Sequence, residues 1–140
     1  MKKAIVTATA EVRAQFNDID PMNVVWHGNY PRFLEVARVA LLERLDYGYA
    51  AMVESGYGWP VVDLNIRYIQ PVKLLDVMVV TAGLTEWENR MKIEFEIRSK
   101  DTGKRLSRAH AVHVAVDLSN NDLLWETPDV FRRKVEPFLS

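Results

Sequence analysis

Apolar residues recur along the chain with two different periods, and each period predicts a different kind of element. Residues 62–68 and 91–98 alternate apolar with polar side chains, which is typical of a strand with one buried face. Residues 4–16 are rich in Val and Thr, and residues 74–84 are apolar on both faces for much of their length. With residues 106–117 as the last strand, the pattern predicts one early strand and a later series of strands.

Residues 30–45 change to the 3.6-residue period of an amphipathic helix, with polar residues on the opposite arc. Pro31 suits the first turn of this helix, because its missing N–H group would have no helical partner there. The apolar arc is wide, as expected for a helix that a sheet wraps around. It consists of Tyr30, Phe33, Leu34, Ala37, Ala40, Leu41 and Leu45.

The segments between these elements hold residues typical of turns and helix ends. Residues 17–29 contain Asn, Asp, Pro and Gly and are expected to form a loop. Asp-Thr-Gly at residues 101–103 predicts a hairpin turn. Thr127 is expected to cap a short terminal helix. The connection after the long helix is marked by Gly48, Gly56 and Gly58.

Successive strands joined by short turns favour an antiparallel sheet, and the single long helix is available to cover one face of it. The predicted fold class is therefore α+β, with a curved antiparallel sheet wrapped around one long central helix. The length of 140 residues fits one domain, which we expect to span residues 1–140.

Composition narrows the possible functions. Lys and Arg total 18 against 19 for Asp and Glu, and this balance argues against nucleic-acid binding, which usually needs a basic excess. The chain has no cysteine, which excludes a thiol nucleophile and a Cys-ligated zinc site. His27, His110 and His113 lack the spacing of metal ligands, and His110 and His113 are expected on opposite faces of a strand. We expect no metal and no cofactor.

The N-terminus resembles a signal peptide, with Lys2 and Lys3 before a short apolar run. Thr7 and Thr9 interrupt that run, so a first strand is the better interpretation. No run approaches the roughly 20 apolar residues of a membrane span. We expect a cytoplasmic protein.

The loop at residues 17–30 has the most specific pattern in the chain. Its sequence, NDIDPMNVVWHGNY, resembles the active-site segment of the 4-hydroxybenzoyl-CoA thioesterase family, whose pattern is roughly D-x-D-x-x-x-hydrophobic-V-aromatic-or-His-x-x-Y. E-V-A-R at residues 35–38 matches the family's helix motif E-x-A-R. Later positions that match the family's pattern are Asn65, Tyr68, Pro71, Asp76 and Glu86-Trp87 before Arg90.

This resemblance implies the hotdog fold and the hydrolysis of an acyl-CoA or acyl-carrier-protein thioester. By position, Asp20 matches the family's catalytic carboxylate, as nucleophile or general base, and the backbone N–H of His27 matches its oxyanion donor. The resemblance also implies a homodimer or a dimer of dimers with active sites at the subunit interface. Such chemistry suits the residues, because a helix N-terminus stabilises the negative charge that develops on a thioester carbonyl.

Other residues are candidates for contacts with the substrate. Trp26 and Trp59 are candidates for an acyl pocket, although aromatic residues near a core helix are more often packing residues. Asn65 matches a family position, and Arg90 is placed by the resemblance to meet a phosphate of CoA. Asp18 is expected to support the loop rather than to react.

Two other functions stay open. A hotdog dehydratase or hydratase also acts on acyl thioesters, but it needs a pattern such as D-x-N-x-x-H, and the spacing from Asp20 to His27 is different. A binding module without catalysis would use the same pocket and basic rim, and the intact segment around Asp20 argues against it.

Overall fold

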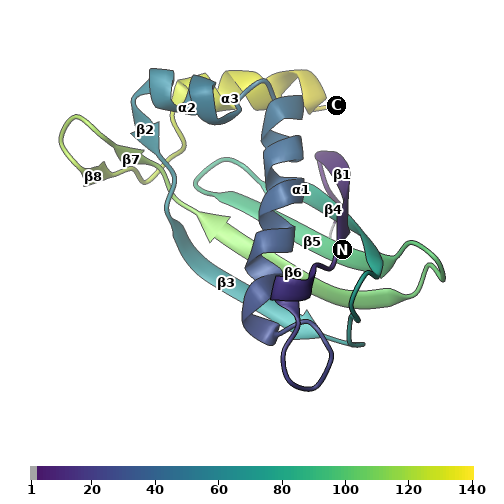
Figure 1. Ribbon diagram of the computed structural model, residues 1–140. Helices are drawn as coiled ribbons and strands as arrows, with labels where there is room; N and C mark the ends of the chain where they lie inside the picture. Colours follow the sequence, from purple (N-terminus) through teal and green to yellow (C-terminus); the bar gives the residue numbers. More distant parts are fainter. Residues whose placement is uncertain (1–2) are drawn as a thin grey trace.

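A five-stranded antiparallel sheet forms the body of the molecule, in a computed structural model that describes residues 3–140. The strands lie in the order β1-β4-β5-β6-β3, and the sheet curves around the long helix α1 (Tyr30–Arg44), as Figure 1 shows. This arrangement confirms the predicted fold class. The strand bounds are β1 Val6–Arg13, β3 Val61–Tyr68, β4 Val77–Glu86, β5 Met91–Ser99 and β6 Arg105–His113.

The core lies between α1 and the concave face of the sheet. Phe33, Ala37 and Leu41 are fully buried on the predicted apolar arc of α1. They face alternate residues of the central strands, since side chains two apart in a strand lie on the same face. The buried residues of these strands are Met78, Val80, Ala82 and Leu84 in β4 and Met91, Ile93, Phe95 and Ile97 in β5.

Smaller elements cover one end of the sheet and of α1 (Figure 1). Two short helices, α2 (Tyr49–Ser55) and α3 (Asp129–Val135), lie there, and a three-stranded sheet with the order β2-β7-β8 projects beside them. The strands of this second sheet are β2 Tyr57–Gly58, β7 Val116–Asp117 and β8 Asp122–Leu123. Single 3₁₀ turns occur at Phe16–Asp18, His27–Asn29 and Glu136–Phe138.

The prediction of one continuous strand over residues 106–117 is wrong. β6 ends at His113, because the β3 and β5 ladders both reach β6 only as far as His113, through Val61 and Met91. Beyond that level the strand pairing stops, and the Val114 N–H donates to the carbonyl of Pro60, just before β3. The chain leaves the sheet, and Val116 pairs with Gly58 of β2 instead.

One further prediction is wrong, and one short helix was not predicted. The connection after α1 contains α2, whose seven residues are too few to give a clear periodic signal. It ends at Gly56, whose φ of 84° few residues other than glycine adopt readily. Thr127 does not cap α3: its hydroxyl donates to the backbone carbonyls of Trp87 and Glu88, because the segment packs against the end of the main sheet.

The two edges of the main sheet differ. β1 lies at one edge and contacts α1, whereas β3 at the other edge is exposed along almost its whole length. Within residues 3–140, no helix is both long and apolar enough to cross a membrane.

Candidate active site

Asp18 holds the loop between β1 and α1 in place. Asp18 is only 2% exposed, and a buried carboxylate needs several hydrogen-bond partners to replace water. The backbone N–H of Gln15 donates to its Oδ2 over 2.8 Å, and the Arg32 guanidinium on α1 donates to both carboxylate oxygens. As expected, Asp18 therefore supports the loop, and it links the loop directly to the helix.

The backbone carbonyl of Asp18 makes a second link to the segment that precedes α1. It accepts hydrogen bonds from the Trp26 backbone N–H over 2.9 Å and from the Asn29 side-chain amide over 3.0 Å. The loop thus folds back on itself. It is also bound to a later part of the chain, because the Val25 N–H donates to the carbonyl of Val72. The hydrogen bonds from residues 26 and 29 to residue 18 therefore close the loop, and residues 19–25 lie between its bonded ends.

Asp20 lies between the two bonded ends of this loop. Its backbone N–H donates to the carbonyl of Val24 over 2.9 Å, and its own carbonyl accepts from Asn23 over 3.0 Å. Asn23 adopts a φ of 64°, which asparagine tolerates better than most residues. The Asp20 carboxylate is half-buried, and its Oδ1 accepts the Met22 backbone N–H over 2.8 Å. The main chain of Asp20 is fixed while its carboxylate remains partly accessible to solvent.

His27 begins the 3₁₀ turn that runs directly into α1. Backbone N–H groups at the start of a helix have no partner within the helix and lie at the positive end of its dipole. The His27 carbonyl accepts a hydrogen bond of 2.6 Å from the Tyr68 hydroxyl at the end of β3. The imidazole is exposed and meets the Tyr68 ring edge-on, with ring centroids 6.5 Å apart. Tyr68 therefore helps to fix the backbone at His27.

Tyr30 and Tyr68 form a pair of rings beneath this turn, with centroids 4.8 Å apart. Burial, with a contribution from the nearby Tyr68, raises the pKa of Tyr30 to about 12. Burial also raises the pKa of Tyr68. Both hydroxyls are therefore protonated at neutral pH, which keeps the Tyr68 hydroxyl available as a donor to His27.

Trp26 covers the start of the same turn. Its ring lies so close to Gly28 that a Cβ atom at position 28 would come within 2.3 Å of it. Trp26 is 48% exposed, and its ring packs at a centroid distance of 5.0 Å from the His27 imidazole. Glycine at position 28 is thus required for this arrangement, which leaves an accessible aromatic surface next to His27.

Trp59 and Arg90, predicted to contact substrate, lie away from this loop. Trp59 is 6% exposed, donates its ring N–H to the Tyr47 hydroxyl over 3.0 Å and packs on Phe131. This placement favours a packing role over a substrate contact. Arg90 lies in the turn between β4 and β5 and pairs with Glu86 over 3.0 Å, with its side chain 45% exposed.

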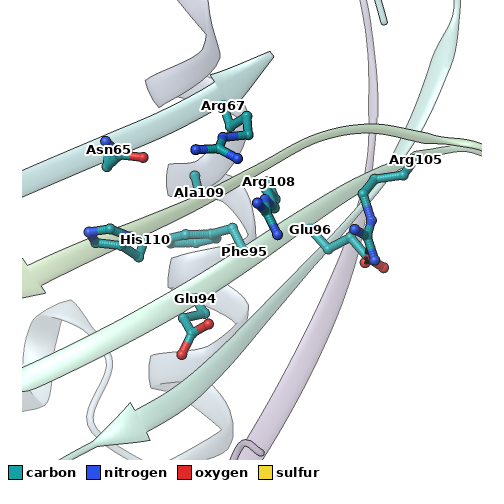
Figure 2. A pocket seen from close by; sticks show the side chains of 9 residues that line it. All are labelled: Asn65, Arg67, Glu94, Phe95, Glu96, Arg105, Arg108, Ala109 and His110. Atoms are coloured by element: carbon teal, nitrogen blue, oxygen red, sulfur yellow. Dashed lines mark hydrogen bonds and ion pairs between the residues drawn. The ribbon is translucent and has the colours of Figure 1, made fainter. Parts of the chain in front are cut away.

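Asn65 lies on the face of the sheet opposite α1. It lines a cavity of about 370 Å³ formed by β3, β5 and β6, shown in Figure 2. Asp20, Trp26 and His27 belong to one loop, whereas Asn65 belongs to this separate hollow.

The two histidines of β6 lie on opposite faces, as predicted. His113 is fully buried beneath α1, and its Nε2 accepts from the Arg38 guanidinium over 3.1 Å. Arg38 also pairs with Glu35 over 3.2 Å. Burial first, and then the charge of Arg38, lowers the pKa of His113 to about 4. His110 lines the outer cavity, and its Nε2 lies 3.4 Å from an Asp63 carboxylate oxygen.

Sequence reasoning gave no role to Arg32 or Tyr68. Arg32 belongs to the polar arc of α1, where a solvated charge is the ordinary interpretation. Tyr68 matches the family pattern, but its contact with His27 joins residues 41 positions apart. Neither contact has a local signal, because each depends on the loop folding back onto α1 and β3.

Comparison with known proteins agrees with this architecture. The family model described as the thioesterase-like superfamily matches residues 14–135. The acyl-CoA thioesterase YbgC of Haemophilus influenzae is 32% identical over 108 residues, which are 76% of this chain and 79% of that protein. The chain belongs to the thioesterase-like superfamily. The 4-hydroxybenzoyl-CoA thioesterase of a Pseudomonas species is 28% identical over 97 residues, covering 67% of this chain and 69% of that protein.

Solved structures show the same fold. The 1,4-dihydroxy-2-naphthoyl-CoA thioesterase Slr0204 of Synechocystis matches with a TM-score of 0.82 at 20% identity, over 93% of this chain and 96% of that chain. A protein of Thermus thermophilus matches with a TM-score of 0.84 at 23% identity, over 94% of this chain and 99% of that chain. These comparisons confirm the family resemblance and the hotdog fold. They also confirm the predicted enzyme class, which is thioesterase.

Proposed function

We propose that this protein hydrolyses an acyl-CoA thioester to the free acid and the CoA thiol, with Asp20 as its catalytic carboxylate. The observation that carries this proposal is the accessible Asp20 carboxylate on a fixed backbone, in the loop that leads into the N-terminus of α1. The relatives named acyl-CoA thioesterases support the substrate class.

The His27 backbone N–H is the proposed oxyanion donor. Negative charge develops on the thioester oxygen in the transition state, and a fixed donor aimed at that oxygen stabilises it without reorganisation. The 15-residue helix α1 adds the positive end of its dipole at the same point. The hydrogen bond from Tyr68 to the His27 carbonyl supports this role, because it restrains the backbone around the donor.

Asp20 has two chemical routes to the same products. As a nucleophile, its carboxylate attacks the carbonyl carbon, the C–S bond breaks to release thiolate, and water then hydrolyses the resulting anhydride. As a general base, it accepts a proton from the attacking water and returns that proton to the departing thiolate. Both routes need the charged carboxylate near the carbonyl, and neither needs a metal or a cofactor.

The substrate is proposed to lie across the exposed aromatic surface of Trp26. Arg90 is exposed enough to meet a phosphate of CoA, although its pairing with Glu86 must then be shared or exchanged. An acyl-carrier-protein thioester presents the same reacting group, and direct assay with both carriers separates the two substrates.

The active unit is proposed to be a homodimer that pairs along β3. This edge strand exposes the apolar residues Val61, Val62 and Leu64, and exposed edges tend to pair with another chain. Tyr68 at the end of β3 contacts His27, so a second copy on this edge would lie next to the catalytic loop and complete a pocket there. Light scattering that gives a monomer at micromolar concentration would contradict this assembly.

The decisive test is thiol release from a panel of acyl-CoA and aryl-CoA thioesters by the wild type and by Asp20→Asn. The substitution keeps the shape of the side chain and removes its charge. We expect hydrolysis by the wild type and its loss in the variant, with CoA thioester binding retained. Hydration of an enoyl-CoA without thiol release would instead identify a hydratase. Tight binding without turnover of any substrate would identify a binding module.

A further inference from the structure

The outer face of the main sheet, opposite α1, carries a row of charged side chains. Strand alternation puts Arg67 of β3 and Arg108 of β6 on this face, where the register sets them directly opposite each other. Asn65 and His110 form the next pair along the same two strands. Figure 2 shows these four side chains around the hollow of about 370 Å³.

The neighbouring acidic residue is already engaged with other arginines. Glu96 of β5 stands opposite Arg108 in the register, but its carboxylate accepts from Arg98 over 2.6 Å and from Arg105 over 3.1 Å. Burial alone would raise the pKa of Glu96, and the hydrogen bonds and charges of these two arginines outweigh it and lower that pKa. Glu96 is thus held as a carboxylate by a different pair of cations.

Arg67 and Arg108 are left with two facing positive charges. Within residues 3–140, neither guanidinium has a hydrogen bond or an ion pair, and Glu94 on the same face has an interaction of its own. Like charges directly opposite in a sheet are destabilising, because their Cβ atoms are only about 5 Å apart. An anion bound between the two side chains removes this repulsion.

We propose that Arg67 and Arg108 form a binding site for a phosphate monoester on the outer face of the sheet. A phosphate monoester carries about −1.5 to −2 charges near pH 7, which matches two guanidinium groups. Each guanidinium can donate two parallel hydrogen bonds to phosphate oxygens, a geometry that lysine cannot supply. The Asn65 amide lines the same hollow and offers a further donor, whereas the Nε2 of His110 already lies 3.4 Å from the Asp63 carboxylate.

This site is independent of the proposed hydrolysis. Tyr68, which contacts the catalytic loop, pairs with Ser107 on the inner side of the sheet, whereas the adjacent Arg67 points to the outer side. Inorganic phosphate and the terminal phosphate of a mononucleotide share the chemistry that this site recognises. The nucleotide has in addition a sugar and a base, for which the rest of the hollow provides room.

The test is an NMR titration of ¹⁵N-labelled protein with inorganic phosphate, 5′-AMP and adenosine at constant ionic strength, because screening would otherwise mask the effect. We expect phosphate and AMP to shift the side-chain and backbone signals of Arg67, Arg108 and His110, and adenosine to leave them unchanged. Tighter binding of AMP than of phosphate identifies a nucleotide site, and equal binding identifies a site for phosphate alone.

Matched variants locate the site. Arg67→Gln and Arg108→Gln should each weaken binding by about tenfold or more, the usual value for a charged hydrogen bond. Arg98→Gln is the control, since it removes an arginine from the same face that is already paired with Glu96. It should change the affinity less than twofold, and all three variants should keep thermal unfolding cooperative.

Three outcomes overturn the proposal. One is binding that is equally strong in the Arg67→Gln/Arg108→Gln double variant. Another is that the NMR signals that move on adding phosphate or AMP are those of residues around His27 rather than around Arg67. The third is a change in oligomeric state by light scattering when Arg108 is replaced. Arg108 lies in β6, off the β3 edge of the proposed dimer, so this change would make the outer face a contact between copies of the chain.

Discussion

The loop between β1 and α1 holds two carboxylates, two positions apart, in different ways. Asp18 is 2% exposed, and both its side chain and its carbonyl have partners on separate parts of the chain. Asp20 is half-buried, and the contact found for its carboxylate is the N–H of Met22, two residues away. One carboxylate connects parts of the fold, and the other is left accessible.

This difference shows how a loop can be held rigid by one carboxylate while a second stays accessible for the proposed chemistry. The partners of Asp18 remove the conformational freedom of the segment, so that Asp20 and His27 need not be ordered when a substrate arrives. The Asp20 carboxylate accepts one hydrogen bond, from the Met22 N–H, so lone pairs stay available for the reaction proposed above. In the proposed mechanism, support and chemistry thus fall to different acids.

The largest expected effect is the loss of activity in Asp20→Asn. An amide is a poor nucleophile and a poor base, so kcat should fall by about 10²–10⁴, the usual contribution of a placed acid–base group. The unfolding free energy should change little, because the carboxylate is not part of the core. Thiol release and urea denaturation measure the two effects, and activity near that of the wild type would refute the proposed role.

The stability of the fold in acid depends on a histidine in the core, His113, rather than on the loop. The folded pKa of His113 is about 4 against 6.5 for the free side chain, because burial and Arg38 disfavour its charged form. The fold therefore favours neutral His113, and stability falls as pH drops from about 6.5 to 4 while the unfolded chain takes up a proton. The full effect is on the order of 3 kcal/mol.

His113→Asn should reduce the acid sensitivity of the fold, measured by urea denaturation at pH 7 and pH 4.5. His110→Asn, on the other face of the same strand, is the matched control for replacing a histidine of β6. An equal pH dependence in wild type and His113→Asn would show that the acid sensitivity originates elsewhere.

Asp18→Asn should lower stability rather than abolish chemistry. It removes the charge that pairs with Arg32, and breaking such a buried contact typically costs about 3–5 kcal/mol. Arg32 is 49% exposed and can be resolvated, so we expect about 2 kcal/mol by urea denaturation. A fall in kcat as large as that of Asp20→Asn, with stability unchanged, would reverse the roles given to the two acids.

Tyr68→Phe tests whether the backbone at His27 must be restrained. Loss of one hydrogen bond to a carbonyl should lower kcat about three- to tenfold and leave KM nearly unchanged, because the donor serves the transition state. Tyr49→Phe, a highly exposed tyrosine on α2, is the control. A change in KM alone would make Tyr68 a substrate contact.

The smallest effect is expected for Arg90→Ala. A phosphate contact at an exposed site serves ground and transition states alike, so KM should rise about two- to fivefold with kcat unchanged. Arg98→Ala, also exposed and paired with a glutamate, is the matched control. An unchanged KM would leave Arg90 as a surface residue paired with Glu86.

Much of the fold was predictable because its signal is local. The 3.6-residue period identified α1 and its buried residues Phe33, Ala37 and Leu41, and alternation identified β3 and β5. The errors occurred where the deciding contact was distant: β6 ends where the β3 and β5 ladders stop, and Thr127 bonds to carbonyls about 40 residues away. Trp26 and Trp59 are the same residue type, yet one is accessible and the other is packed in the core.

The sequence by itself determined the class of fold, the position of the loop and the family, since periodicity and a contiguous motif depend only on neighbouring residues. Only the tertiary structure decided which acid is buried and which tyrosine holds His27. It also set Arg67 opposite Arg108, through the register of β3 and β6. The physical reason is that hydrogen bonds and charge pairs act over a few ångströms in space, whatever the separation along the chain, so their partners are fixed only when the chain has folded.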